Sequence, residues 1–128
     1  MKRGGILHPD LSHLLASTGH TDYFTVCDRG FPVPEGLPRI DLALIDDLPT
    51  VLDVLRAVHA EFIIDRVVVA EEMSAFSSQR LAEMRALLGD VPIEAVPHLE
   101  LKRLSAAGKA TVRTGDTCAY GNILIVSG

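Results

Sequence analysis

Arg66-Val67-Val68-Val69-Ala70 is the segment that most clearly indicates the fold class of this chain. After Arg66 the run is nearly all β-branched and has no polar alternation, which is typical of a strand covered on both faces. A second, fully apolar run extends from Ile123 to Val126. Because such strands have to be enclosed, the two runs indicate a sheet with helices on its faces.

Helices and strands alternate along the rest of the chain. Further strands are predicted at Tyr23 to Cys27, Arg39 to Leu44, Val91 to Val96 and Lys109 to Thr114. Helices are predicted at residues 11–18 (with Asp10 as N-cap and Gly19 as C-cap), Thr50 to Phe62, Gln79 to Leu88 (capped by Ser77) and Leu99 to Ala107. This alternation predicts an α/β fold with a largely parallel sheet. A length of 128 residues without linker or repeat predicts one domain over residues 1–128.

Composition and charge exclude several classes of partner. The chain carries 12 basic and 17 acidic residues, a formal net charge of −5. This balance argues against binding nucleic acid, whose phosphates need clustered Lys and Arg, and against an anionic membrane surface. No apolar run approaches the roughly 20 residues that span a bilayer, and we expect no signal peptide. Aromatic residues make up 5% and Trp is absent, so small aliphatic residues dominate, which suits buried strands and a flat subunit contact.

Polar residues near the strand ends are the first candidates for a ligand site, because ligands of α/β sheets bind beyond the carboxyl ends of the strands. Asp28 directly follows one predicted strand, where it is either a ligand acceptor or an ordinary turn residue. Tyr120 and Asn122 flank Gly121 before the last strand. Residues i and i+2 of a strand point the same way, so this pair either faces one pocket or simply starts a strand.

Histidines are the candidate proton carriers, since an unperturbed imidazole has a pKa of about 6.5. His20 lies in a Gly-His-Thr-Asp loop after the first helix, where a catalytic role and a surface or capping role are both open. His98 and Lys102 are four residues apart, so on a helix they share one face about one turn apart. Either they bind a ligand together or they form a solvated helix start.

Metal and cofactor motifs are missing from the sequence. It contains no GxGxxG, no P-loop and no GxSxG pattern. Glu71-Glu72 has no histidine at ligand spacing nearby, so we expect it to fix a loop or a subunit contact. The two cysteines, Cys27 and Cys118, form no CxxC pair, and reduced thiols are expected. We therefore expect no metal and no cofactor.

Seven short segments are distinctive when they are taken together. They are Met1-Lys2-Arg3-Gly4, Gly19-His20-Thr21-Asp22, Cys27-Asp28, Phe31-Pro32-Val33-Pro34, Arg39 to Leu44, Ala70-Glu71-Glu72 and Tyr120-Gly121-Asn122-Ile123. In this order and at this spacing they resemble the D-ribose pyranase (ribose mutarotase) family, close kin of the L-fucose mutarotases. Each motif alone is weak, but the resemblance covers nearly the whole chain.

The resemblance implies a cytoplasmic enzyme of ribose catabolism that interconverts the pyranose and furanose forms of D-ribose on a three-layer α/β/α fold. It implies that His20 is the catalytic proton donor. The residues that it implies around the sugar are Asp28, His98, Lys102, Tyr120, Gly121 and Asn122. It also implies self-association into a ring, typically a decamer of two stacked pentamers with sites near the subunit boundaries.

Two alternative functions remain open at this point. Gly121 is compatible with an L-fucose mutarotase that exchanges anomers, because those enzymes often carry Gly where pyranases commonly carry Ala. A non-catalytic sugar-binding module of a ribose transporter would bind ribose without accelerating exchange. His20 favours catalysis, since a pure binder needs no titrating group in that loop.

Overall fold

The computed structural model describes residues 1–128, which form one α/β domain. The elements in chain order are α1 (Pro9–Ser17), β1 (Tyr23–Cys27), β2 (Arg39–Asp41), α2 (Val51–His59), β3 (Ile64–Ala70), α3 (Glu72–Phe76), α4 (Ser78–Leu88), β4 (Ile93–Val96), α5 (His98–Ser105), β5 (Thr111–Arg113) and β6 (Ile123–Ser127). No helix is long and apolar enough to cross a membrane.

The six strands form one sheet in the order β2-β5-β1-β6-β3-β4. The β1–β5, β2–β5 and β3–β4 pairs are parallel, whereas β6 is antiparallel to both of its neighbours, β1 and β3. The expected largely parallel sheet is therefore confirmed, with one reversed strand at its centre. Because β6 is reversed, its first residue lies at the edge where the other strands end.

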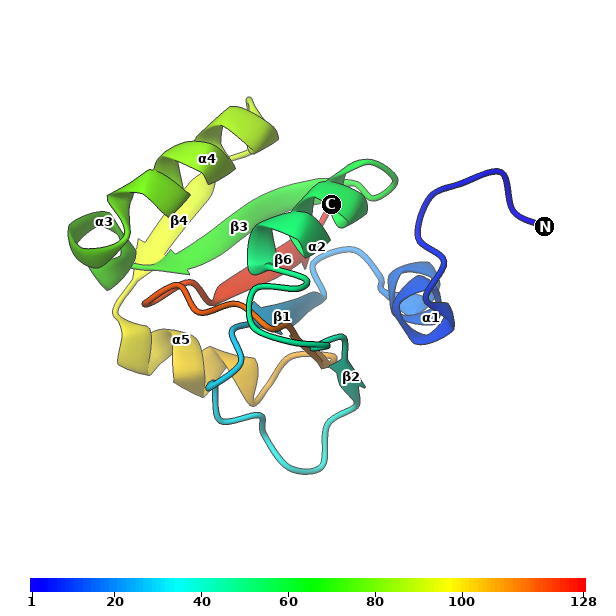
Figure 1. Ribbon diagram of the computed structural model, residues 1–128, viewed down its shortest axis with the longest axis horizontal. Coiled ribbons are helices and arrows are strands. Elements are labelled where there is room, and N and C mark those ends of the chain that lie inside the picture. The colour runs from blue at the N-terminus through cyan, green and yellow to red at the C-terminus, as the bar shows by residue number, and fades with distance from the viewer.

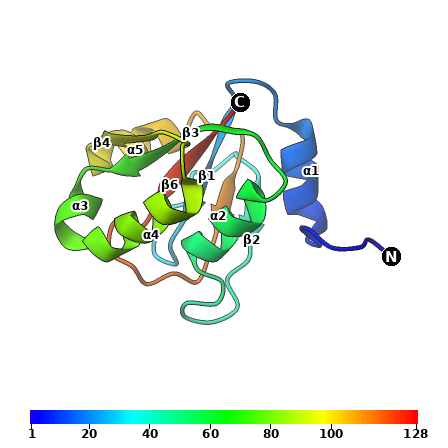
Figure 2. The ribbon, with the colours of Figure 1, turned by 90° about the horizontal axis from the view of Figure 1, so that it is seen from above.

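Helices cover both faces of the sheet, as the three-layer expectation requires. α2 and α4 lie over one face and α5 lies over the other (Figures 1 and 2). β6 contributes to the core on each side, because Ile125 packs under α2 and α4 whereas Leu124 packs with Leu101 of α5. α1 adds Leu11 and Leu14 to the first of these cores.

The caps of α1 differ from those expected. His8, not Asp10, is the N-cap, and its Nδ1 accepts a hydrogen bond from the backbone N–H of Leu11 at 3.4 Å. Pro9 follows at the first helical position, where its missing N–H is no loss. Thr18, not Gly19, is the C-cap. The helix therefore begins two residues and ends one residue earlier than the apolar spacing indicated.

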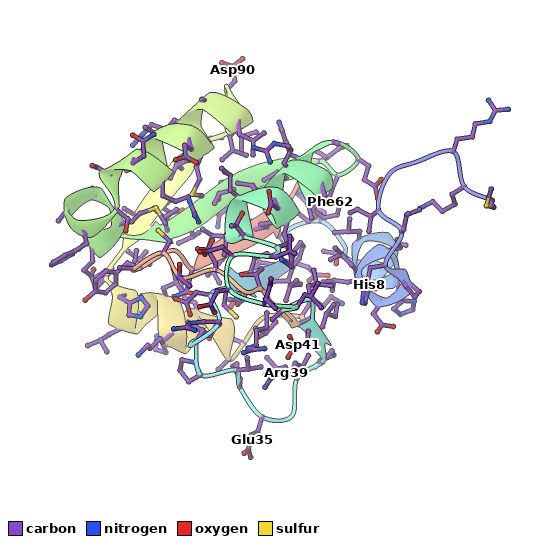
Figure 3. All side chains as sticks on the ribbon, in the orientation of Figure 1. His8, Glu35, Arg39, Asp41, Phe62 and Asp90 are labelled. Atoms are coloured by element: carbon purple, nitrogen blue, oxygen red, sulfur yellow. The ribbon has the colours of Figure 1, made fainter.

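Other boundaries moved for local reasons. β2 ends at Asp41 rather than Leu44, because the following segment turns back and Leu44 N–H bonds to Leu48 O at 3.0 Å. α2 was expected at Thr50 to Phe62 but runs from Val51 to His59, because Thr50 is its N-cap, in a reciprocal capping box with Asp53. The proline-rich segment between β1 and β2 forms a loop, with Glu35 at its tip pointing away from the body of the molecule (Figure 3).

The segment between β3 and α4 holds an element that the sequence did not predict. It is the short helix α3, at Glu72–Phe76. Ser77 is the N-cap of α4, but its hydroxyl makes no capping bond and donates instead to the carbonyl of Ala119 at 2.5 Å. A hydrogen bond to a residue far along the chain has therefore replaced a local cap at this position.

Candidate active site

Asp28 and Asn122 meet at the edge of the sheet where β1 ends and β6 begins. The backbone N–H of Asp28 donates to Asn122 Oδ1 at 2.7 Å. Asn122 is 3% exposed, so its amide is fixed in place by the surrounding core. Asp28 Oδ1 also accepts from Gly30 N–H at 2.9 Å. Asp28 is therefore a turn residue, and it also lies at the candidate site. Its second carboxylate oxygen has no partner in the chain and is left for a ligand.

His98 and Tyr120 extend the same site. The two rings meet edge to face, with centroids 5.2 Å apart at 87°. The ring of Phe76 also lies 5.2 Å from that of Tyr120, and Phe76 is largely exposed. Tyr120 has a φ of 53°, which is a left-handed backbone conformation. This conformation is uncommon for residues other than Gly, because it crowds the Cβ atom, and it persists only where the surrounding structure imposes it. The rings of His98 and Phe76 therefore contact a tyrosine whose backbone is strained.

Glu72 fixes the start of α5, and this contact was missed at the sequence level. Both of its carboxylate oxygens accept from the backbone N–H of His98, at 3.2 and 3.1 Å. A carboxylate at a helix N-terminus is electrostatically favourable. The Glu71-Glu72 pair was expected to fix a loop or a subunit contact. Glu72 fixes the start of α5, which it reaches because it lies on the unpredicted helix α3.

The protonation of His98 follows from its surroundings. Burial and then the ammonium of Lys102 lower the pKa of His98, and the carboxylates of Glu72 and Asp28 offset them only in part. The imidazole is therefore neutral at pH 7 and can donate through one nitrogen and accept through the other. Its Nδ1 is buried without a partner, which leaves Nε2 as the nitrogen that a ligand can reach. Lys102 itself is exposed, one turn further along α5.

His20 does not join these residues within one chain. It is exposed in the loop before β1, and that loop is tied to the far end of β6, because Thr21 N–H donates to Ser127 O at 3.1 Å. His20 and Asp28 lie beyond opposite ends of β1, whose five residues span roughly 13 Å from the first Cα to the last. In Figure 1 the α1–β1 loop lies on the α1 side, whereas α3 and the start of α5 lie on the opposite side.

Residues 1–128 match the sequence profile of the RbsD / FucU transport protein family. The chain belongs to this family. The chain is similar to a D-ribose pyranase 2 of Rubrobacter xylanophilus, with 46% identity over 100% of this chain and 84% of the relative. A D-ribose pyranase of Geobacillus thermodenitrificans is 42% identical over 100% of this chain and 97% of the relative.

Solved structures of the RbsD / FucU family share the fold. Bacillus subtilis RbsD complexed with D-ribose superposes with a TM-score of 0.95 and 35% identity, over 100% of this chain and 98% of that one. The fucose mutarotase of Streptococcus pneumoniae in complex with L-fucose superposes with a TM-score of 0.79 at 20% identity, over 95% of this chain and 93% of that one. The second likeness is one of fold alone.

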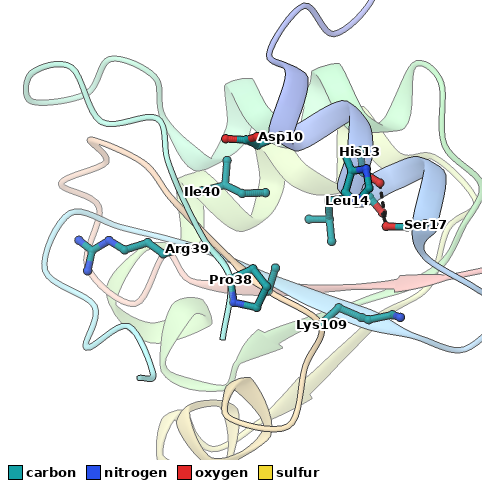
Figure 4. Close-up of a pocket in the computed structure, with 9 residues that line it drawn as sticks. Asp10, His13, Leu14, Ser17, Pro38, Arg39, Ile40 and Lys109 are labelled. Carbon is teal, nitrogen blue, oxygen red and sulfur yellow. Dashed lines mark hydrogen bonds between the residues drawn. The ribbon is translucent and has the colours of Figure 1, made fainter. Parts of the chain in front are cut away.

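A cavity of about 420 Å³ lies away from the residues that the family resemblance singles out. It separates α1 from β2 and the start of β5, with His13, Ser17 and Lys109 among its lining residues (Figure 4). Lys109 is paired with Asp22, and none of the expected sugar-binding residues lines the cavity. The shape of a single chain therefore does not by itself reveal the site, whose residues converge at an open edge of the sheet.

Proposed function

We propose that this chain is a D-ribose pyranase, an isomerase that interconverts the pyranose and furanose forms of D-ribose. The full-length likeness to a ribose-bound RbsD, with a TM-score of 0.95, is the observation that carries the proposal. Curated relatives at 41–46% identity bear the same activity in their names. The convergence of Asp28, His98, Tyr120 and Asn122 at one edge supports it independently.

The chemistry of ring exchange explains why these groups suffice. Exchange passes through the open aldehyde, so a proton must reach the ring oxygen and another must leave the anomeric hydroxyl. Closure through the hydroxyl on C4 or on C5 then gives furanose or pyranose. No bond to water or to the enzyme forms, and a well-positioned acid typically contributes about 10²–10⁴-fold. In this proposal His20 is that acid.

The remaining residues hold the sugar through hydrogen bonds. Asp28 accepts from sugar hydroxyls through its free carboxylate oxygen, and Asn122 presents its amide beside it. His98 offers Nε2 and Tyr120 its phenol, while Lys102 approaches from the next turn of α5. Either Asp28 or His98, or a water that they hold, serves as the base. Gly121 lets the chain pass close to Cys118 between the two side chains that bind.

The separation of His20 from the other residues supports a composite site. We assign the proton donor to His20 of the partner subunit, which an exposed position on an ordered loop allows. Self-association into a closed ring, of which a decamer is the form implied by the family, would complete every site in the same way. Exposed Phe76 and Leu99 flank His98 and Tyr120 and supply an apolar rim for such a contact. A cytoplasmic role in ribose catabolism is part of the same proposal.

Saturation-transfer NMR on D-ribose tests the activity directly. The wild type is expected to accelerate pyranose–furanose exchange, and His20→Ala is expected to abolish the acceleration. His13→Ala is the matched control, because His13 is an exposed histidine of α1 outside the proposed site. Exchange on L-fucose but not on ribose would favour the L-fucose mutarotase alternative. Ribose binding without any acceleration would favour the sugar-binding module.

Mixing two inactive variants tests the composite site. His20→Ala and the double variant Asp28→Ala/His98→Ala, which lacks both candidate bases, are altered at opposite edges of the chain, so a mixed ring would contain some sites in which all three residues are intact. Random mixing of equal amounts would restore about a quarter of the wild-type activity. If the mixture stays as inactive as its components after co-refolding into rings, the site is built within one chain and the assignment fails.

A further inference from the structure

Asp116 is a buried carboxylate that the proposed mechanism does not use. It lies between β5 and β6 and is 0% exposed. Its Oδ2 accepts from the N–H of Val51 at 2.8 Å, and its Oδ1 accepts from the N–H of Cys118 at 2.8 Å. The guanidinium of Arg80 adds contacts of 2.5 and 3.4 Å to the two oxygens. A charge this deep persists only with such complete pairing.

The backbone of Asp116 also contacts the segment that carries Asp28. Its carbonyl accepts from Arg29 N–H at 3.1 Å, directly beside Asp28. Its side chain holds Cys118 N–H, two residues before Tyr120. Asp116 therefore connects the loop that carries Asp28 to the loop that carries Tyr120 and Asn122.

Helix α4 holds the Tyr120 loop at two places. Arg80 forms an ion pair with Asp116. Ser77, one turn earlier, donates a hydrogen bond to Ala119 O at 2.5 Å. Phe76, next to Ser77, packs on the ring of Tyr120. Arg80 is only 14% exposed in its side chain, so the ion pair is shielded from water rather than a surface pair of little effect.

We propose that Asp116, in its ion pair with Arg80, is a positioning residue for sugar binding. It sets the relative placement of Asp28 and the Tyr120–Asn122 segment without touching the sugar. The inference rests on the proposed function of that site. In Asp116→Asn the shape is kept, but one acceptor oxygen becomes a donor that faces N–H groups, and the guanidinium of Arg80 loses its counter-charge. The Tyr120 loop then shifts, while His20 at the opposite edge stays in place.

A split between KM and kcat is therefore the expected signature. Asp116→Asn and Arg80→Met should each raise the KM for D-ribose about tenfold, which is about 1.4 kcal/mol of lost binding. The kcat should change less than about threefold, because the proton donor is not displaced. Arg80→Lys, which keeps the charge, should recover part of the loss. The double variant should be no worse than Asp116→Asn alone, since both changes remove one interaction.

The matched control is Asp53→Asn, the same chemical change in the exposed capping box at the start of α2. It lowers stability without contact with the Tyr120 loop, so its KM should equal that of the wild type. An unchanged KM in folded Asp116→Asn, or an equal rise of KM in Asp53→Asn, would overturn the proposal. If Asp116→Asn does not fold, Arg80→Lys and Arg80→Met decide the question by the same criterion.

NMR of the aromatic side chains keeps this test separate from that of the activity. In Asp116→Asn the ring resonances of Tyr120 and His98 should shift, whereas those of His20 should not. This readout needs no turnover, so it would still report on positioning if the wild type failed to exchange ribose. Unshifted Tyr120 and His98 signals would contradict the proposal even in an active enzyme.

Discussion

Replacement of Asn122 by Ala is the sharpest probe of how the site is built. Asn122 is 3% exposed and its Oδ1 is the partner of Asp28 N–H at 2.7 Å. Truncation leaves that half-buried N–H without an acceptor, at a loss of about 1–2 kcal/mol in the free energy of unfolding. For a domain of 128 residues, this loss lowers Tm by roughly 4–8 °C. Loss of the amide contact to the sugar should also raise the KM about five- to tenfold.

Thermal unfolding by circular dichroism and saturation-transfer NMR measure the two effects on the same sample. Thr25→Val is the control, because the hydroxyl of Thr25 in β1 is buried without a partner. Removing it should leave stability unchanged or raise it by up to about 1 kcal/mol. The reasoning is refuted if Asn122→Ala unfolds at the wild-type Tm, or if Thr25→Val loses as much stability as Asn122→Ala.

Three further outcomes follow from the structure. Gly121→Ala should keep ribose exchange within about threefold of wild type, because its Cβ would lie 3.1 Å from Cys118 O and need only a small shift. Burial raises the pKa of Cys27 to about 12, so iodoacetamide at pH 8 should label only Cys118 in the folded protein and both thiols after denaturation, as counted by mass spectrometry. Burial alone would raise the pKa of Asp116, but bonds from Arg80, Cys118 and Val51 outweigh it and hold that pKa below its ordinary value. Its stabilising contribution is thus present above about pH 4 and lost as the pH falls further, so Asp116→Asn should flatten the acid limb of stability against pH in denaturant titrations.

The layered α/β architecture can be predicted from the amino-acid sequence. Two continuous apolar runs, at Val67 to Ala70 and at Ile123 to Val126, need burial on both sides, which a sheet covered on both faces provides. Both runs are strands in the structure. β1 was predicted with its observed bounds, because its β-rich residues end at a turn signal. Local patterns also placed the start of α2 within one residue of its observed start at Val51. These features depend on neighbours in the chain, which a sequence displays.

Which candidate residues meet could not be predicted from the sequence and depends on the folded chain. Strand direction depends on contacts far apart in the chain, and the reversal of β6 is what carries Tyr120 and Asn122 to the edge where Asp28 and His98 lie. The same arrangement leaves His20 at the opposite edge, although its loop and Asp28 flank one short strand. The roles of Glu72 and Asp116 also escaped the sequence, because His98, the partner of Glu72, and Arg80 and Val51, two partners of Asp116, are 26 to 65 residues away. A carboxylate acquires its function from what packs around it, and packing is settled only when the whole chain has folded.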